Sequence, residues 1–490
     1  MGLNYYVGID IGTTSVKSLA FSESGQLLST NSVAYKMLHP QPGYSELNAK
    51  EILEAVIHSI NQTVEFLEPA IPIFISFSSM MHSLISVDKT GEPLTNCIIW
   101  ADNRASEIAD QLALTQAGKI FYESTGVPVH AMTPLSKILW LKENDPGIFY
   151  STYKFIGIKE YIFYQFCGEY IVDSSVASAT GFLNINTLSW DKNILEYVDI
   201  QVSSLSIVVS PKHSIKFNAG NNKINDLQIP AATNLIVGGS DGPLANLGAG
   251  SVDGKSMTIT IGTSSAARIV SDHPETDSKM HTFCYHLKDN LYVMGGAGNN
   301  GAVVLEWLKD KLLETTESFP ELFSRANKIA AGSDGLLFIP YILGERAPIW
   351  NSNARGLFFG LTINHTKSHL IRACMEGVIY GIYSIAKILL EKKRITVIHA
   401  TGGFAQSHLW VQMLADVCNI KILVSGNVES SALGAVMIAI EALGHEPFSI
   451  KDTLASYEPD LVSHAIYMKS FEKSGRIYES LKEEWISAQM

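Results

Sequence analysis

Two short stretches with nearly the same letters stand about half the chain apart. The first, IGTTS, contains Gly12, Thr13 and Thr14, and the second, IGTSS, contains Gly262 and Thr263. Each follows an apolar run that is typical of a β-strand, which predicts a tight hairpin turn. The backbone N–H groups and hydroxyl groups of such a turn suit a phosphate chain. A plain hairpin is the alternative for either copy alone, and the duplication favours phosphate binding.

A carboxylate precedes the first copy and not the second, whereas a basic residue follows each copy, at Lys17 and Arg268. Asp10 stands at the predicted strand end, where a carboxylate can hold hydrated Mg²⁺, and Lys17 adds a positive charge. Because Thr260 replaces the aspartate in the second copy, we expect the metal on one side only. A third turn contains Gly402 and Gly403, whose missing side chains let a flat ring such as adenine approach the backbone. The alternative for that turn is an ordinary strand-to-helix connection.

Alternating strand and helix patterns must position these turns. A long helical pattern with an apolar stripe runs from Lys367 to Arg394. The sequence therefore predicts an α/β protein. Strands are predicted at Tyr5 to Asp10, Ser15 to Ser22, Ile73 to Ser78, Leu235 to Gly238, Met257 to Ile261, Ile395 to Ala400 and Lys421 to Val424.

The chain length predicts more than one domain. A single core rarely organises 490 residues, so we expect two. Glycines are dense from Gly238 to Gly254, where turn chemistry also peaks. We therefore predict a boundary there, with domains over residues 1–250 and 251–490.

Composition restricts the partners. The formal net charge of −12 argues against nucleic acid or an anionic membrane as the main partner. The N-terminus lacks a signal pattern, and the longest apolar runs look too short to span a bilayer. The five cysteines are scattered without metal spacing, as expected in a reducing compartment. We expect a cytoplasmic protein, and the charge leaves a phosphorylated or carboxylated small ligand open as a partner.

An ordered series of segments carries a family resemblance. It runs from about Tyr5 to about Leu443 and comprises GIDIGTTSVK, MMHSLISVD, IIWADNRA, GGSDGPLANLGAG, ITIGTSS, GERAPIWNSNARGLFFGL and ATGGFAQSHLW. In this order the segments resemble the FGGY carbohydrate kinases, a family of the actin-like, ribonuclease-H-like ATPase superfamily. The resemblance implies two domains with a deep cleft, the first binding mostly the sugar and the second mostly ATP. It also implies cleft closure, which excludes water from the reaction.

The resemblance assigns the catalytic base to Asp241. Transfer of a phosphoryl group to an alcohol needs alignment, charge neutralisation and a base for the hydroxyl proton. Asp241 follows an apolar strand and lies at the predicted domain boundary, where both ligands could meet. The alternative is a turn aspartate, since Asp-Gly is a common turn dipeptide.

Sugar contacts are expected from several further segments. Met81 and His82 occupy positions where the family contacts substrate hydroxyls, and Trp100, Asn103 and Arg104 follow on the next segment. An aromatic face, an amide and a guanidinium together can select a polyol, and Arg104 can bind a carboxylate with two hydrogen bonds. A helix start capped by Asp102 or Asn103 is the alternative, and it can hold at the same time.

Weaker candidates complete the two sides of the predicted site. His130 and Lys159 map near family substrate positions, or could be surface residues, whereas Asp173 looks like structural support for a serine-rich turn. Glu345 and Arg346 lie in a loop expected to border the cleft. ATP binding is assigned to Gly12, Thr13, Thr14, Lys17, Gly262, Thr263, Gly301, Gly402, Gly403 and Ser407, and the metal Mg²⁺ to Asp10. Ser407 stands where some relatives have Asn, and Ala302 where a second glycine is frequent.

The segments MHSL and WADNRA resemble the gluconate kinases of the family most, with the xylulose kinases as near neighbours. The expected reaction is transfer of the γ-phosphoryl group of ATP to the C6 hydroxyl of gluconate, and family habit suggests a homodimer. A pentulose kinase is the alternative within the enzyme class. An actin- or chaperone-like ATPase would not need the two sugar segments, and a silent sugar sensor would not need Asp10 and Asp241.

Overall fold

The computed structural model describes residues 4–217, 226–230, 233–425, 429–448 and 453–487. The chain forms two compact units. The first comprises Met1–Gly250, Ser271–Val293 and Glu429–Ile450, and the second comprises Ser251–Val270, Met294–Val428 and Lys451–Met490. The predicted division at residue 250 matches one of these boundaries. It differs for two later segments, which pack with the first unit.

A six-stranded sheet of order β13-β14-β5-β1-β2-β3 forms the centre of the first unit. β1, β5 and β14 are parallel neighbours, and β1, β2 and β3 form an antiparallel meander. The predicted strands of this unit are confirmed to within two residues at each end. The strands are β1 (Asn4–Ile11), β2 (Ser15–Ser22), β3 (Leu27–Ala34), β5 (Ile71–Ser79), β13 (Ser214–Lys216) and β14 (Asn234–Ser240).

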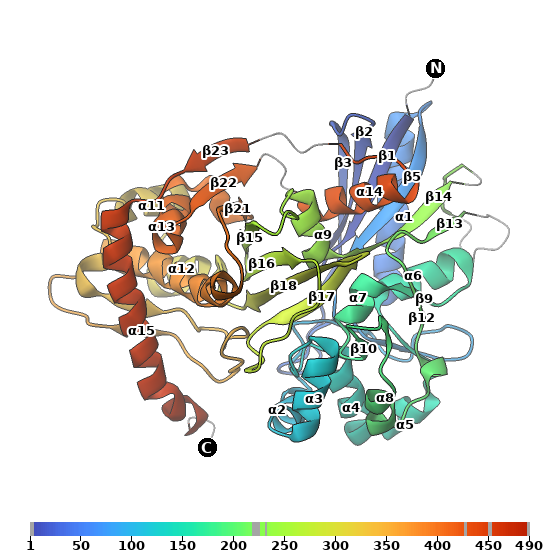
Figure 1. Ribbon diagram of the computed structural model, residues 1–490, viewed down its shortest axis with the longest axis horizontal. Coiled ribbons are helices and arrows are strands. Elements are labelled where there is room, and N and C mark those ends of the chain that lie inside the picture. The colour runs from blue at the N-terminus through green and yellow to red at the C-terminus, as the bar shows by residue number, and fades with distance from the viewer. Residues whose placement is uncertain (1–3, 218–225, 231–232, 426–428, 449–452, 488–490) are drawn as a thin grey trace. The chain divides into compact units, whose positions relative to one another are not determined.

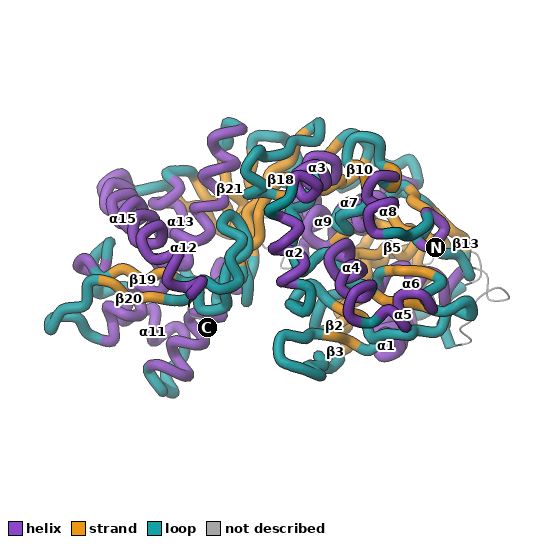
Figure 2. Tube along the Cα trace, turned by 90° about the horizontal axis from the view of Figure 1, so that it is seen from below, coloured by secondary structure: helices purple, strands orange, loops and turns teal. Residues whose placement is uncertain are grey.

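Helices pack on this sheet because apolar side chains line the strands. The core includes Val7 and Ile9 of β1 and Phe77 of β5, all fully buried. A second core cluster lies among the helices α4, α5 and α8, which Figure 2 shows together. The main helices of this unit are α1 (Ala49–Leu67), α2 (Ser106–Ala113), α3 (Gln116–Thr125), α4 (Pro134–Asn144), α5 (Pro146–Ser151), α6 (Ile158–Cys167), α7 (Ser174–Ser178), α8 (Lys192–Val198), α9 (Asp241–Gly248) and α14 (Ser430–Ala442).

The second sheet has the order β17-β18-β16-β15-β21-β22-β23. Its centre repeats the first sheet: an antiparallel hairpin, β15 with β16, is followed by two parallel strands, β21 and β22, and an antiparallel edge strand. Each IGT turn therefore closes the hairpin of one sheet. The strands are β15 (Ser256–Ile261), β16 (Ser265–Ser271), β17 (Phe283–Lys288), β18 (Leu291–Gly298), β21 (Val397–Thr401), β22 (Lys421–Ser425) and β23 (Thr453–Tyr457).

The helices of the second unit include α10 (Val303–Trp307), α11 (Phe319–Ala326), α12 (Lys367–Lys392), α13 (His408–Cys418) and α15 (Leu461–Ser487). Figures 1 and 2 show α12, α13 and α15 side by side. By length and composition α12 could cross a membrane, so the expectation that its apolar run is too short was wrong. About two thirds of its most apolar window is buried in the protein, as in the core helix of a globular protein.

The glycine-rich segment from Gly238 to Gly254 contains the boundary at Gly250, but most of it is regular secondary structure. The end of β14 and the whole of α9 occupy most of it. Its glycines serve close contacts: a Cβ on Gly248 would lie 1.9 Å from the carbonyl oxygen of Ser430, at the start of α14. Glycine density here reflects packing against a distant segment, which the local sequence does not reveal.

Glycines bring α14 against α9 and against β1, although more than half of the chain separates α14 from β1. A Cβ on Gly434 would lie 2.1 Å from the carbonyl oxygen of Leu244 in α9, and one on Gly8 would lie 2.5 Å from that of Ala432. Figure 1 shows α14 in orange beside the blue strands β1 and β5. Backbones approach this closely only where no side chain intervenes.

We predict that Gly434→Ala destabilises the protein. The added methyl group would meet the backbone of α9, and overpacking of this kind costs about 1–3 kcal/mol. The apparent Tm should fall by several degrees in a thermal melt. Gly475→Ala is the matched control, because Gly475 lies in α15 with open space at its Cβ position. Equal melting of the two variants would contradict the proposed close contact.

Candidate active site

The carboxyl ends of three parallel strands align at one edge of the first sheet. Ser78 of β5 is the Cα partner of Asp10 in β1 and of Gly239 in β14. Met81 and His82 begin two residues after the end of β5, and Asp241 follows β14 directly as the first residue of α9. The strand register therefore places the predicted metal ligand Asp10, the sugar segment that begins at Met81 and the predicted base Asp241 at the same edge of the sheet.

Asp10 is partly buried beside polar and charged groups. The hydroxyl group of Ser78 donates to its carboxylate at 2.9 Å. Burial raises the pKa of Asp10, and Glu429 raises it further, while hydrogen bonds from Ser78 and Ser431 and the charge of Lys17 lower it. Burial thus outweighs the contacts that stabilise the charged carboxylate.

Lys17 and Glu429 form an ion pair of 2.6 Å next to Asp10. Lys17 is the cross-strand partner of Asp10 in the β1–β2 hairpin, and Glu429 immediately precedes α14. Sequence reasoning missed Glu429, because nothing in its local sequence marks a residue that returns to the first turn. The charge of Lys17, expected to serve phosphate, is already paired within the protein.

The first IGT turn is a hairpin in which the N–H group of Gly12 donates to the carbonyl oxygen of Ser15 at 3.0 Å. Thr14 is exposed, and the hydroxyl group of Thr13 accepts a hydrogen bond of 3.1 Å from the indole of Trp100. This bond links the predicted phosphate turn to the predicted sugar segment inside the first unit.

His82 is buried, and its backbone lies in the left-handed region at φ 66°. Its Nδ1 contacts the carbonyl oxygen of Ala179 at 2.8 Å, and its Nε2 contacts the hydroxyl group of Tyr285 at 3.3 Å. Met81 beside it is partly exposed. The ring of His82 is thus held from both sides, which suits either a fixed substrate contact or a structural role.

Arg104 binds two carboxylates of its own chain. It donates to both carboxylate oxygens of Asp102 at 2.8 Å and also pairs with Glu46. The guanidinium carbon lies 3.9 Å from the centroid of the Tyr44 ring. Burial lowers the pKa of Arg104, but the hydrogen bonds and charges of Asp102 and Glu46 outweigh this effect and raise it. In this structure the carboxylate that Arg104 binds with two hydrogen bonds is that of Asp102.

Asn103 and His130, two further predicted sugar contacts, make few hydrogen bonds that indicate a role. Asn103 is exposed, and its backbone N–H group donates to the carbonyl oxygen of Gly43 at 2.8 Å. Neither Asp102 nor Asn103 caps a helix, since α2 begins after Ala105 without a side-chain cap. His130 accepts a hydrogen bond of 3.2 Å from the N–H group of Met132, just before α4.

Lys159 does not reach a surface on which sugar could bind. Its side chain is 2% exposed and its ammonium forms an ion pair of 2.5 Å with Asp173. It also donates to the carbonyl oxygens of Val237 and Gly239, at 3.1 and 2.9 Å. An ammonium has three donors, so no N–H group remains for a ligand. We therefore correct the expectation of a substrate contact, whereas Asp173 is the structural support that was expected.

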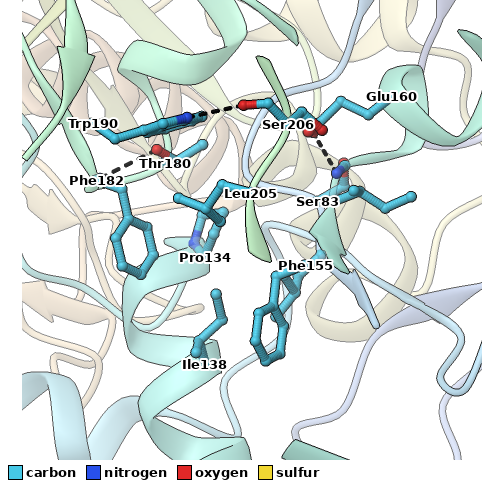
Figure 3. Close-up of a pocket in the computed structure, with 13 residues that line it drawn as sticks. Ser83, Pro134, Ile138, Phe155, Glu160, Thr180, Phe182, Trp190, Leu205 and Ser206 are labelled. Carbon is cyan, nitrogen blue, oxygen red and sulfur yellow. Dashed lines mark hydrogen bonds between the residues drawn. The ribbon is translucent and has the colours of Figure 1, made fainter. Parts of the chain in front are cut away.

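The pocket beside these residues, shown in Figure 3, is too small for a sugar. Its volume is about 20 Å³, space for about one water molecule. It is lined by Ser83, Glu160 and Ser206 among apolar side chains. Burial raises the pKa of Glu160 to about 7, although its hydrogen bonds with Ser206 and Gly157 lower it. The pocket is an internal packing space next to the sugar segment.

The second unit gathers its own predicted residues around the second IGT turn. A Cβ on Gly301 would lie 2.4 Å from the carbonyl oxygen of Gly262, and one on Gly402 would lie 2.5 Å from that of Ile261. Gly402 also has φ 94°, a conformation that favours glycine. The carbonyl oxygen of Thr263 accepts the N–H group of Gly301 at 3.1 Å. Glycine at these positions permits close backbone contact.

A pocket of about 650 Å³ opens next to this cluster. Gly403 and Ser407 line it, and Ser407 also caps α13 by accepting the N–H group of Trp410 at 3.3 Å. Its walls are mostly apolar and aromatic with a few polar groups, which is typical of a small-molecule site. The pocket also contains Asn327, an amide that sequence reasoning missed because it follows α11 in a segment without a motif.

Glu345 and Arg346 are buried in the loop between β19 (Leu337–Ile339) and β20 (Leu357–Phe359). Glu345 accepts hydrogen bonds from the N–H group of Asn299 at 2.5 Å and from the side chain of Asn300 at 3.0 Å. Burial raises its pKa. In the second unit these residues fix the end of β18 and the chain that leads to Gly301.

Two family models together match most of the chain. The model of the N-terminal domain of the FGGY family of carbohydrate kinases matches residues 5–248, and the model of its C-terminal domain matches residues 257–443. The chain belongs to the FGGY family of carbohydrate kinases. It is thus an enzyme that uses ATP to phosphorylate a small sugar-type molecule.

Three relatives describe its place in that family. The chain is 43% identical over 453 residues to gluconokinase of Bacillus subtilis (strain 168), covering 90% of this chain and 88% of the relative. It resembles the crystal structure of gluconate kinase from Lactobacillus acidophilus with a TM-score of 0.94 and 34% identity over 98% of both chains. It also resembles ligand-bound xylulose kinase from the same organism, with a TM-score of 0.95 and 34% identity over 99% of this chain and all of the other.

Lys137 of α4 is a buried cation that sequence reasoning missed. It donates to the carbonyl oxygens of His82 at 2.5 Å and of Ile98 at 3.2 Å, so it ties together the two predicted sugar segments. Burial lowers its pKa to about 7, against the opposing charges of Asp102 and Cys97. In sequence it looks like one more helical lysine.

We predict a pH-dependent contribution of Lys137 to stability. Between pH 7 and about 10.4 the unfolded chain holds a proton on this lysine that the folded protein lacks, so the free energy of unfolding rises with pH. The Tm of the wild type should therefore rise relative to that of Lys137→Met as the pH increases from 7 to 9.5. The slope is at most about 1.4 kcal/mol per pH unit.

Thermal melts of both proteins across this pH range check the prediction. Lys119→Met, which replaces an exposed lysine of α3, is the control and should show a constant difference from the wild type. A difference between wild type and Lys137→Met that does not change with pH would contradict the lowered pKa.

Proposed function

We propose that this protein is a gluconate kinase that transfers the γ-phosphoryl group of ATP to the C6 hydroxyl group of D-gluconate. The observation that carries the proposal is the 43% identity to gluconokinase over nine tenths of the chain. The segments MHSL and WADNRA support it. The two solved kinases resemble this fold equally well, so the backbone does not favour gluconate over xylulose and the choice depends on side chains.

Asp241 is the proposed base. Its carboxylate is partly exposed at the N-terminus of α9 and accepts the N–H group of Gly242 at 2.8 Å. In the proposed step the carboxylate takes the proton of the C6 hydroxyl group as that oxygen bonds to the γ-phosphorus. The bond between this phosphorus and the bridging oxygen breaks, and the electron pair leaves with ADP.

Asp10 is the proposed metal ligand. Among the described residues no group of three or more His, Cys, Asp and Glu side chains could hold a metal ion alone. A single carboxylate with neighbouring hydroxyl groups fits Mg²⁺, which keeps several waters and takes one or two carboxylates together with phosphate oxygens. When bound, this ion would neutralise charge on the transferred phosphoryl group.

The sugar is proposed to contact Met81, His82, Trp100, Asn103 and His130. Arg104 remains the proposed partner of the substrate carboxylate, although its pairs with Asp102 and Glu46 mean that any such contact adds to an existing ion cluster. These internal pairs also hold the segment that carries Trp100. The role of each residue is a prediction.

ATP is proposed to bind through the two IGT turns and the pocket of the second unit. Gly403, Ser407 and Asn327 would contact the adenosine, and Thr13 and Thr263 lie in the turns that would hold phosphates. Gly402 and Gly301 would act indirectly by letting the backbone approach Ile261 and Gly262. We further propose a cytoplasmic homodimer. We also propose that it has no nucleic-acid or membrane partners, which the net charge of −12 supports.

A substrate panel tests the proposed reaction. Purified protein with Mg-ATP should release ADP many times faster with gluconate than with xylulose, glycerol or no acceptor. Preference for xylulose would overturn the gluconate proposal and retain the kinase family. ADP release that is independent of any sugar would favour an ATPase, and the absence of release with every acceptor would favour a sugar sensor.

The variant Asp241→Asn tests the base. Asparagine keeps the size and the bond to Gly242 but accepts no proton, so turnover should fall by at least about 10³-fold while nucleotide binding stays within about twofold. Steady-state kinetics and calorimetric titration with ADP measure the two quantities. Asp310→Asn, at an exposed position, is the control and should retain wild-type turnover. Turnover of Asp241→Asn near that of the control would remove the base assignment.

A further inference from the structure

The buried ammonium of Lys159 is directed at the backbone of β14, close to Asp241. Lys159 is the second residue of α6, and its two carbonyl partners, Val237 and Gly239, flank Gly238. Gly239 stands two residues before Asp241 in the chain. The charges of Lys159 and Asp241 are close enough to interact.

β14 is irregular at this point. Its pairing with β5 shifts register between Ile236 and Gly239, and Gly238 has φ 69°. A Cβ on Gly238 would lie 2.0 Å from the carbonyl oxygen of Phe77. A bulge takes backbone groups out of the hydrogen-bond ladder. The ammonium of Lys159 supplies donors to the two carbonyl groups beside the bulge, after which the pairing resumes at Gly239.

Asp173 balances the charge and extends the support. One carboxylate oxygen pairs with Lys159 at 2.5 Å, and the other accepts the N–H group of Val176 at 2.9 Å, which caps α7. Asp173 is fully buried. An unpaired charge at this depth would cost several kcal/mol, so the two groups depend on each other.

Ser175, in the first turn of α7, completes the connection. Its hydroxyl group lies 2.8 Å from that of Ser240 and accepts the N–H group of Ser240 at 3.2 Å. Ser240 immediately precedes Asp241. Lys159 therefore holds Val237 and Gly239, and Ser175 of α7 holds Ser240. The two supports are connected, because Asp173 both caps α7 and pairs with Lys159.

We propose that Lys159, Asp173 and Ser175 form a positioning network that fixes the orientation of Asp241. The network touches no substrate, and it sets where the carboxylate stands when the hydroxyl proton moves. This inference depends on the proposed role of Asp241 as the base. A displacement of about 1 Å at such a group can reduce turnover about 10²-fold.

The experiment uses two variants, and neither leaves a buried charge without its partner. Ser175→Ala removes the bonds to Ser240, and the double variant Lys159→Met/Asp173→Asn removes the ion pair while asparagine can still cap α7. Each should lower kcat about 10-fold to 100-fold and leave KM for gluconate and ATP within about twofold. A rise in KM with little change in kcat would overturn the proposal. It would instead support the earlier expectation that Lys159 contacts the substrate.

A second comparison separates positioning from general destabilisation. The same changes made in Asp241→Asn protein should have little further effect, because the group that they orient no longer accepts a proton. An equal loss in both backgrounds would overturn the proposal. Ser59→Ala, at a fully buried serine of α1 whose hydroxyl group donates only to its own helix at 3.0 Å, is the matched control and should keep wild-type kcat.

The outcomes also distinguish this inference from the base assignment. If Asp241→Asn alone retains near-normal turnover, the base assignment fails, and the network inference fails with it. If Asp241→Asn is inactive and the network variants keep wild-type kcat, the positioning inference alone fails.

Discussion

The register of three parallel strands is the constraint on which the first unit depends. Hydrogen bonds between β1, β5 and β14 set Asp10, Ser78 and Gly239 in one row, so the residues that follow each strand emerge at the same edge. Backbone pairing is more exact than loop packing, because a slip of one residue would turn every side chain to the other face. Acidic and polar groups that differ widely in sequence position are therefore held together by strand geometry.

The duplicated turn corresponds to a duplicated sheet, but the copies have diverged in geometry as well as in sequence. In the first hairpin Ile11 pairs with Val16, whereas in the second Ile261 pairs with Ser265. The second turn is therefore shorter, and its carbonyl groups contact the residues before α10. Only the first copy carries a carboxylate at its base. The two halves share an architecture and differ in the charged groups at their turns.

Local signals predicted much of this fold. The strands around both turns and the long helix α12 were visible as hydrophobic patterns, and the ordered motifs indicated the family. The contacts of Lys17 with Glu429 and of Arg104 with Glu46 were not predictable, because each joins segments that only the folded chain brings together. Lys159 was misread for the same reason: nothing in its helical pattern shows that the strand it faces has a bulge. The proposed ligand roles of the site residues stay predictions.

The return of α14 to the first unit has a consequence for folding during synthesis. A ribosome makes the strands of the first sheet long before it makes Ser430–Ala442, yet α14 packs against both β1 and α9 through glycine contacts. The first unit therefore stays incomplete until most strands of the second sheet, β15 to β22, have been made. The two units of this kinase do not mature one after the other, as independent domains do, and completion of the first waits for nearly the whole polypeptide.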